Sequence, residues 1–513
     1  MASGDQKCFT TSSHIVPKES GLLAATDLAA GTSVLSVRQP LLTVVDTAHL
    51  QETCSNCFTW RPRSPFATVH DNGSESRPAL KACLGCKAVR YCGKACQSLA
   101  WKRIHRYECK LFEGLQPRVL PTSVRAVLQI LLRKDKGQLS AEQWSAILKL
   151  QSHIREFRQE GGRKLEGIGL MSKGAHAYSG TSLSEEFVQE LYCKVLINSL
   201  TLVTPTFDPI GICVDPLAAS INHSCNPNSV VVFDGPRLTV RSTHGIGKHE
   251  EITISYIDCT ERYGWRQPEL LERYFFCCGC EKCRREALTQ EEDDLITVED
   301  RRIDLTTLES EVSNMLREAK QKSSSGDFRA AIKLLKDALK ILSNPLWQWP
   351  NDRQPSPSVR QQLAINHLAV GDWIPSAKQM LTIYFRVNPL LYPESWHPVR
   401  VVHNWTLATL ILQLSSLSAS DPGAVQELET YRLDYGKVVW GLLKEVEGNI
   451  DRSHGSDSGF AAQVRRKVEE VRVDMTRGDD ASSSSSRLKL QPDEEWLEEE
   501  WTKLRQIAES VDL

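Results

Sequence analysis

The sequence of 513 residues lacks several features that would assign it to a particular class of protein. Its 62 basic and 64 acidic residues nearly balance, so the formal charge of -2 gives no global argument for binding nucleic acid or anionic membranes. No apolar run approaches the roughly 20 residues of a membrane helix, and residues 1–20 contain no apolar stretch of signal-peptide length. We therefore expect a soluble intracellular protein of the nucleus, the cytoplasm or both, with about two to four domains.

Cysteine is absent from residues 284–513, although the chain contains 16 cysteines. In a reducing compartment, cysteines grouped at short spacings indicate metal binding rather than a disulfide framework. The uneven distribution also predicts a domain boundary near residues 284–300.

Four pairs of potential zinc ligands lie within residues 54–109. Each pair has a chelating spacing, and together they are Cys54 and Cys57, Cys83 and Cys86, Cys92 and Cys96, and His105 and Cys109. Structural zinc takes four Cys or His ligands, so eight ligands fit two closed sites, although the sequence alone does not show how the pairs combine. A DNA-binding finger is an alternative, but a solvated charged surface explains the basic residues more simply. These basic residues are Lys87, Arg90, Lys94, Lys102, Arg103 and Arg106.

A further cysteine, Cys225, directly follows the motif Asn222-His223-Ser224. Its potential partners lie downstream, at Cys278, Cys280 and Cys283. Four cysteines complete a third zinc tetrahedron, so His223 is not needed as a ligand, although that role is its main alternative. Cys277 could also replace its neighbour Cys278 as a ligand.

Hydrophobic patterns predict an α+β protein with several domains. Period-two or apolar runs predict strands at residues 34–37, 41–45, 229–233, 237–241 and 251–256. Apolar residues at helical spacing predict helices at residues 124–133, 142–157 and 185–203. The zinc-binding segment therefore interrupts a β-rich domain rather than preceding it.

Past Asp300 the pattern is helical almost throughout. The turn Gly326-Asp327 recurs as Gly371-Asp372, each followed by an apolar helical pattern, which indicates stacked helix pairs resembling tetratricopeptide repeats. A plain helical bundle is the alternative. Residues 478–486 have the composition of a linker, and residues 493–513 can form an acidic amphipathic helix that docks on the other helices.

Two segments resemble a known family. The run from Cys83 to His105, with Tyr91-Cys92 and Trp101, is similar to a MYND finger, although residues 58–82 form a longer insert than is usual there. The second resemblance is to the split SET domain of the SET and MYND domain-containing (SMYD) protein lysine methyltransferases. It rests on the motif that begins at Asn222, the run Glu250 to Tyr256, and Phe276 before the cysteines.

The resemblance extends from about residue 21 to residue 283 and implies a domain order. It places the N-terminal part of the SET domain at 10–50, the MYND finger at 54–109, a helical insert at 115–200, the SET core at 201–258, a post-SET zinc segment at 270–285 and an all-α domain at 300–513. It also implies three structural zinc ions. Cys54, Cys57, Cys92 and Cys96 would hold the first, Cys83, Cys86, His105 and Cys109 the second, and the four remaining cysteines the third.

The same resemblance implies a cofactor site for S-adenosylmethionine. Its contacts would be Gly21, Asn198, Asn222, His223, Tyr256 and Phe276, with Phe276 packed on the adenine. Tyr256 would place its hydroxyl at the methyl-transfer site, and Tyr274 would line the lysine channel. The chain departs from the family at Glu19, where a first glycine usually stands.

These features predict a protein lysine N-methyltransferase that acts on a histone or another protein. The alternative is an adaptor in which the SET domain is inactive and the finger docks proline-rich peptides beside the helical domain. The intact residues Asn222, His223, Tyr256 and Phe276 favour the enzyme, and Glu19 favours the adaptor.

Overall fold

The computed structural model describes residues 10–11, 14–18, 21–62, 79–298, 301–347, 349–421, 423, 426–479 and 494–510. Contacts divide the chain into two compact units. Unit 1 takes the described parts of residues 1–63, 75–257 and 267–278, and unit 2 those of residues 64–74, 258–266 and 279–513.

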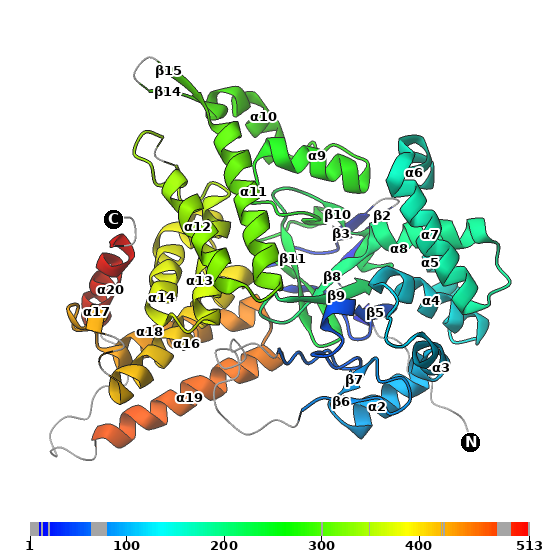
Figure 1. Ribbon diagram of the computed structural model, residues 1–513, viewed down its shortest axis with the longest axis horizontal. Helices are drawn as coiled ribbons and strands as arrows, with labels where there is room; N and C mark the ends of the chain where they lie inside the picture. The colour runs from blue at the N-terminus through cyan, green and yellow to red at the C-terminus, as the bar shows by residue number, and fades with distance from the viewer. Residues whose placement is uncertain are drawn as a thin grey trace. The chain divides into compact units, whose positions relative to one another are not determined.

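Unit 1 contains three small sheets that meet around one hydrophobic core (Figure 1). In the first sheet the strand order is β1 (Thr10–Thr11), β4 (Ser33–Val37), β12 (Arg237–Ser242) and β11 (Ser229–Asp234). The second has the order β10 (Asn222–His223), β13 (Glu251–Ile254), β3 (Gly21–Ala24) and β2 (Ile15–Lys18). The third has the order β5 (Leu42–Val45), β9 (Pro209–Val214) and β8 (Leu200–Val203).

In the second sheet, Asn222 and His223 form the two-residue strand β10. This strand runs parallel to β13, with Asn222 opposite Thr253 and His223 opposite Ile254. Strand β3 pairs with β13 in the antiparallel sense and brings Gly21 to the same sheet. Leu22 and Ile252 are at most 1% exposed, so alternation along β3 and β13 fixes which side chains enter the core.

The cysteine-rich finger is an insertion into this β-rich unit. It contains β6 (Lys81–Ala82), β7 (Arg90–Tyr91), α2 (Lys94–Ala100), the π-helical turn η2 (Trp101–His105) and α3 (Arg106–Leu115). The chain enters the finger from β5 and returns later to β9, which pairs with β5 along its length. Pairing of strands from before and after the finger places it outside the sheet.

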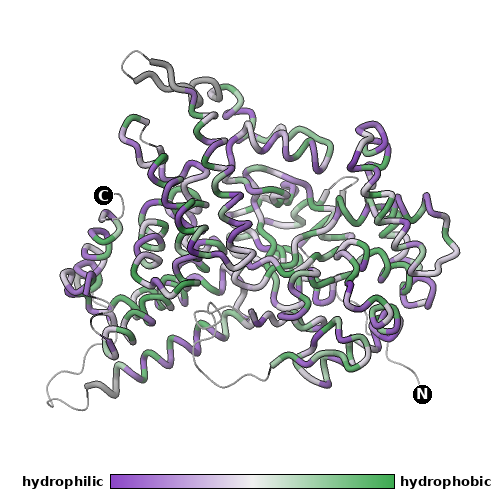
Figure 2. Tube along the Cα trace, viewed as in Figure 1, coloured by the Kyte–Doolittle hydropathy of each residue, from purple (hydrophilic) through white to green (hydrophobic). Residues whose placement is uncertain are grey.

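Five helices of unit 1 pack around a second cluster of buried apolar side chains. They are α4 (Thr122–Asp135), α5 (Ala141–Lys149), α6 (Ile154–Glu160), α7 (Gly162–Ser179) and α8 (Glu185–Asn198). Val127, Leu131 and Leu191 are at most 1% exposed, and each such side chain contributes about 1.5–3 kcal/mol by leaving water. Figure 2 shows hydrophobic and hydrophilic stretches alternating along this part of the chain.

Three predicted elements end differently in the structure. The helix expected at 142–157 is two helices, α5 and α6, because His153 takes a left-handed φ of 48° between them. The helix expected at 185–203 ends at Asn198, and the next residues form β8 because they pair with β9. The strand expected at 251–256 ends at Ile254, so Tyr256 lies in the turn beyond it.

Residues 284–300, where the sequence predicts a domain boundary, lie within regular elements over most of their length. Helix α10 (Glu281–Asp294) crosses the first part of this range, and a hairpin of β14 (Leu295–Val298) and β15 (Arg301–Asp304) follows. The change between the compact units falls instead after residues 257 and 278. The boundary predicted from the absence of cysteine stays a prediction.

Unit 2 is helical after β15. Its described helices include α11 (Leu305–Ser324), α12 (Phe328–Leu342), α13 (Ser356–Ala369), α14 (Trp373–Thr382), α16 (Pro398–Ser420), α18 (Tyr435–Ser453), α19 (Gly459–Asp479) and α20 (Glu494–Glu509). Gly326 and Gly371 have φ values of 86° and 82° in the turns that precede α12 and α14. The repeated Gly-Asp motif therefore lies in turns that join paired helices. The assignment of these helices to tetratricopeptide repeats stays a prediction.

Helix α20 docks on other helices of unit 2, as its amphipathic pattern predicts. Leu504 and Ile507 are at most 1% exposed, and Trp501 donates a hydrogen bond of 3.1 Å from its indole nitrogen to the Tyr384 hydroxyl.

Most of the predicted linker, from residue 480 on, lies outside the described residues. Within the described helices, none has both the length and the apolar content needed to cross a membrane. The α+β fold class is confirmed.

Candidate active site and zinc groups

Three groups of four side chains have the composition and proximity of zinc sites. Within each group the potential ligand atoms lie within 4.8 Å of one another. The groups are Cys54, Cys57, Cys92 and Cys96, then Cys83, Cys86, His105 and Cys109, then Cys225, Cys278, Cys280 and Cys283. Four soft ligands at these distances fit a closed tetrahedral zinc site. The finger ligands interleave as the resemblance to MYND fingers implies.

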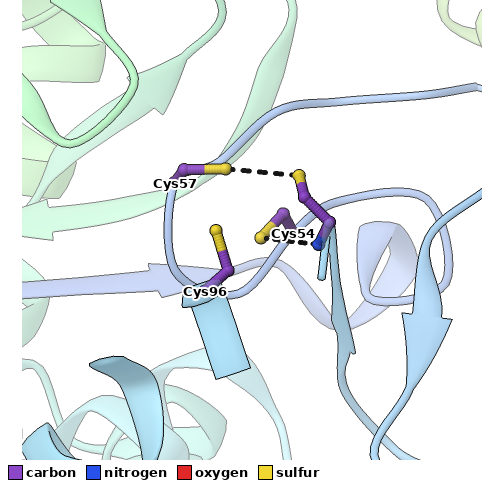
Figure 3. A group of neighbouring side chains, drawn as sticks. Cys54, Cys57 and Cys96 are labelled. Carbon is purple, nitrogen blue, oxygen red and sulfur yellow. Dashed lines mark hydrogen bonds between the residues drawn. The ribbon is translucent and has the colours of Figure 1, made fainter. Parts of the chain in front are cut away.

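The first group forms where the loop before the finger meets β7. Cys54 is fully buried, and its sulfur accepts a hydrogen bond of 3.4 Å from the backbone nitrogen of Cys92. The sulfurs of Cys57 and Cys92 lie 3.4 Å apart. Figure 3 shows the thiols of Cys54 and Cys57, from one loop, converging with that of Cys96, from α2. A backbone donor to a thiolate favours the charged form that binds metal.

The second group is buried within the finger. His105 Nε2 lies 3.4 Å from the Cys83 sulfur, while the other ring nitrogen lies 3.8 Å from a carboxylate oxygen of Glu108. Both His105 and Glu108 are at most 3% exposed. A carboxylate behind a ligating histidine orients the ring and increases its basicity. The sequence analysis missed Glu108, although a glutamate three residues after a helical histidine is a recognisable signal.

The third group excludes Cys277, which is exposed, in favour of Cys278. Gln267 holds the backbone of Cys278 in both directions, donating to its carbonyl at 3.0 Å and accepting from its amide nitrogen at 2.9 Å. The fully buried Arg266 donates to the Cys283 sulfur at 3.6 Å and pairs with Glu286 at 2.8 Å. A guanidinium beside a thiolate offsets part of the negative charge of a four-cysteine group.

Asn222 and Gly21 form one wall of the candidate active site. The Asn222 amide donates to Glu251 Oε1 at 2.6 Å. Gly21 has a φ of 120°, and a Cβ there would lie 2.5 Å from that oxygen and 2.8 Å from the Asn222 amide nitrogen. Asn228, which is 5% exposed, donates to the Glu251 carbonyl at 2.7 Å and accepts from the Thr253 amide at 2.8 Å. Asn228 thus fixes β13, a role that the sequence analysis missed.

His223 connects the aromatic part of the site to a zinc group. Its Nδ1 accepts a hydrogen bond of 3.0 Å from the backbone nitrogen of Tyr256, so the proton of the neutral ring belongs on Nε2. Nε2 lies 3.2 Å from the sulfur of Cys225 and can donate to it. His223 therefore supports a zinc ligand and is not a member of the group itself.

Four rings cluster beside the Asn222-His223 strand. Tyr256 and Tyr274 have ring centroids 5.0 Å apart, and Phe276 lies 5.8 Å from His223 and 6.4 Å from Tyr256. The Tyr256 hydroxyl donates to the Ile221 carbonyl at 2.6 Å, and the Tyr274 hydroxyl donates to the Tyr256 carbonyl at 3.3 Å. Burial raises the pKa of Tyr256 to about 12 and also raises the pKa of Tyr274.

One predicted cofactor contact stands apart from this description. Asn198 ends helix α8, where its amide donates to the carbonyls of Lys194 and Gln151, both at 2.8 Å. Its role as a cofactor contact stays a prediction. Glu19 lies outside the described residues.

Comparisons with known proteins match about half of the chain. A SET-domain profile matches residues 19–257. The chain is 31% identical over 274 residues to "SET domain and MYND-type zinc finger protein 6" of Schizosaccharomyces pombe, covering 53% of this chain and 51% of that protein. It is 29% identical over 283 residues to "Histone-lysine N-methyltransferase SMYD3" of Homo sapiens, covering 54% and 61%. "N-lysine methyltransferase SMYD2-B" of Danio rerio is 26% identical over 284 residues, covering 54% and 59%.

The matches thus span 51 to 61% of the length of these relatives. The SET-domain match includes β10, β13 and Tyr256, and ends before Tyr274 and Phe276. Residues 19–257 therefore match the SET domain, and about half of the chain is similar to proteins named for SET and MYND domains.

Proposed function

We propose that this protein is a protein lysine N-methyltransferase that uses S-adenosylmethionine. The observation that carries the proposal is the cluster of Tyr256, Tyr274 and Phe276 against the Asn222-His223 strand. The substrate would be a lysine side chain of a histone or another protein. The two methyltransferases compared above have names that state this activity for them.

The residues present fit the cofactor. Phe276 offers an aromatic face for adenine, and the ring of Tyr256 lies 6.4 Å from it. Gly21 lets Glu251 and the Asn222 amide approach its backbone more closely than a Cβ would allow, which helps to hold Asn222 in place. When bound, S-adenosylmethionine would supply an activated methyl group on a sulfonium.

The protein's own contribution is to prepare and align the amine. A lysine attacks only as the neutral amine, and with a reference pKa of about 10.4 this form costs roughly 4–5 kcal/mol at pH 7. The half-buried rings of Tyr256 and Tyr274 form surroundings that disfavour the ammonium. The transfer breaks a sulfur–carbon bond and forms a nitrogen–carbon bond, and the amine proton leaves to solvent. Each zinc group is filled by four protein ligands and would act structurally.

Replacing Tyr256 with phenylalanine tests the proposed activity. The variant keeps the ring but removes the hydroxyl that donates to Ile221. We expect methyl transfer to a lysine peptide or protein extract to fall roughly 100-fold, since a misaligned amine loses the advantage of orientation. Labelled methyl transfer measures the rate, calorimetry measures cofactor binding, and Tyr178→Phe on exposed α7 is the control.

The outcomes separate the enzyme from the adaptor. Cofactor binding by the wild type without any methylated product would favour the adaptor. Absence of cofactor binding by zinc-loaded protein would contradict the enzyme altogether.

The pH dependence gives a second test of the same proposal. Because burial raises the pKa of Tyr256 to about 12, its phenol stays protonated well above neutral pH. The unfolded chain loses this proton near pH 10, so the contribution of Tyr256 to stability is present below about pH 10 and declines above it. We expect the single-turnover rate to rise from pH 7 to 9.5 as the substrate amine deprotonates. A rate that falls over this range while the protein stays folded would contradict this assignment.

Further proposals concern partners and location. Exposed apolar side chains on the finger, Leu84, Leu99 and Trp101, support docking of proline-rich peptides there. Titration with such a peptide should respond to Trp101→Ala, and an unchanged affinity would contradict the docking site. The many zinc-binding thiols suit a reducing compartment, which supports an intracellular location in the nucleus or cytoplasm.

A further inference from the structure

Three consecutive aromatic residues of unit 1, Tyr274, Phe275 and Phe276, pack their rings in two different surroundings. The ring of Tyr274 lies 5.0 Å from that of Tyr256, and the ring of Phe276 lies 5.8 Å from that of His223. Phe275, between them, packs instead against His153 of the segment that begins α6, at 5.3 Å. The middle ring therefore anchors the same stretch of chain that presents the outer two rings to the candidate site.

The backbone of Phe275 shows that the anchor is not incidental. Phe275 directly follows the last residue of α9 (Tyr263–Tyr274), and its amide donates to the Leu271 carbonyl at 3.1 Å. It has a φ of 61°, the left-handed conformation that glycine usually supplies at this position after a helix. A residue with a Cβ is strained there, so the packing of the phenylalanine ring must offset a cost that glycine would avoid.

The Phe275 ring packs against residues of α6 and the start of α7. The ring of His153 is stacked on that of Phe275 with an angle of 29°, and Phe157 meets it edge-on at 4.8 Å. The Lys164 ammonium lies 5.4 Å from the Phe275 ring centre. The same ammonium donates to the Glu272 carbonyl at 2.6 Å, in the last turn of α9. Lys164 therefore holds both the ring and the helix end from which Tyr274 projects.

We propose that Phe275 is a positioning residue for methyl transfer. Its ring, held by His153, Phe157 and Lys164, fixes the backbone direction that brings Tyr274 and Phe276 to the site. The inference rests on the proposed lysine methyltransferase activity and adds to it. It gives the helices between the finger and the SET core a part in the geometry of the lysine channel.

Phe275→Gly tests this role because it removes the ring while easing the backbone strain. We expect kcat for a lysine peptide to fall roughly 10- to 100-fold, the penalty of misplaced reacting groups, with zinc content unchanged. Phe275→Tyr should restore most of the rate, because it keeps the ring. Lys164→Met should lower kcat in the same direction by a smaller factor. Leu170→Ala, which truncates a side chain that is 69% exposed on the same helix as Lys164, is the matched control.

Amide hydrogen exchange of residues 272–278 provides a readout that does not depend on catalysis. We expect faster exchange in Phe275→Gly than in the wild type or in Leu170→Ala. Unchanged exchange, or an unchanged kcat in a wild type that methylates lysine, would overturn the positioning role and leave the proposed function standing. If the wild type methylates no lysine, the proposed function fails, whereas the exchange comparison still decides whether Phe275 orders this segment.

Discussion

Replacing Gly21 with alanine should weaken binding of S-adenosylmethionine roughly 10- to 100-fold. An added Cβ would lie 2.5 Å from a carboxylate oxygen of Glu251 and 2.8 Å from the amide nitrogen of Asn222, both inside van der Waals contact. Their hydrogen bond of 2.6 Å would have to break, a loss of about 1.5–3 kcal/mol for a bond to a charged group. The φ of 120° adds strain of about 1–3 kcal/mol for any residue except glycine.

The strain is carried by the free protein as well as by the cofactor-bound form, so it lowers the stability of the fold. Affinity falls because the Asn222 amide, a predicted cofactor contact, is displaced, and the loss of one such hydrogen bond, about 1.5–3 kcal/mol, corresponds to roughly 10- to 100-fold. Calorimetric titration with the cofactor measures the change. Gly167→Ala is the matched control, because a Cβ at this position of α7 meets no neighbour. It should leave binding unchanged and stabilise the helix by about 0.5–1 kcal/mol. Equal affinity of Gly21→Ala and the wild type would show that this wall does not face the cofactor.

The zinc ligands and the site strands could be predicted because their signals are local. Chelating pairs such as Cys83 and Cys86 have a fixed spacing, and the apolar alternation of residues 237–241 appears as strand β12. The same holds for the Gly326-Asp327 turn, where a left-handed glycine precedes a helix. In these places local geometry and the final fold require the same residues.

The remaining features depend on contacts between distant residues. Residues 200–203 continue a helical apolar pattern, yet they form β8 because β9 offers strand partners. The roles of Asn228 and Gln267 arise from hydrogen bonds to strands or loops that only the fold brings near. The helix break at His153 likewise has no glycine or proline that would predict it. In the folded structure the His153 ring stacks on that of Phe275. Polar side chains that serve another residue's backbone leave no periodic signal.

Replacing Cys278 with serine should remove one zinc ion and, with it, cofactor binding. Phe276 lies two residues before Cys278, and His223 lies two residues before Cys225 and 3.2 Å from its sulfur. The metal group therefore holds the ends of both segments whose rings meet at 5.8 Å. Structural zinc binds such groups with about 10–16 kcal/mol of apparent free energy, so loss of one ligand releases both segments at once.

Cys277 provides a matched control for this experiment, because it is the adjacent residue, is exposed and lies outside the group. Elemental analysis should find three zinc ions per chain in the wild type and in Cys277→Ser, and two in Cys278→Ser, in keeping with the three ligand groups. Cofactor affinity should fall at least tenfold in Cys278→Ser alone. Loss of one zinc ion with full cofactor affinity would contradict the coupling, because His223 and Phe276 would then keep their places without the metal.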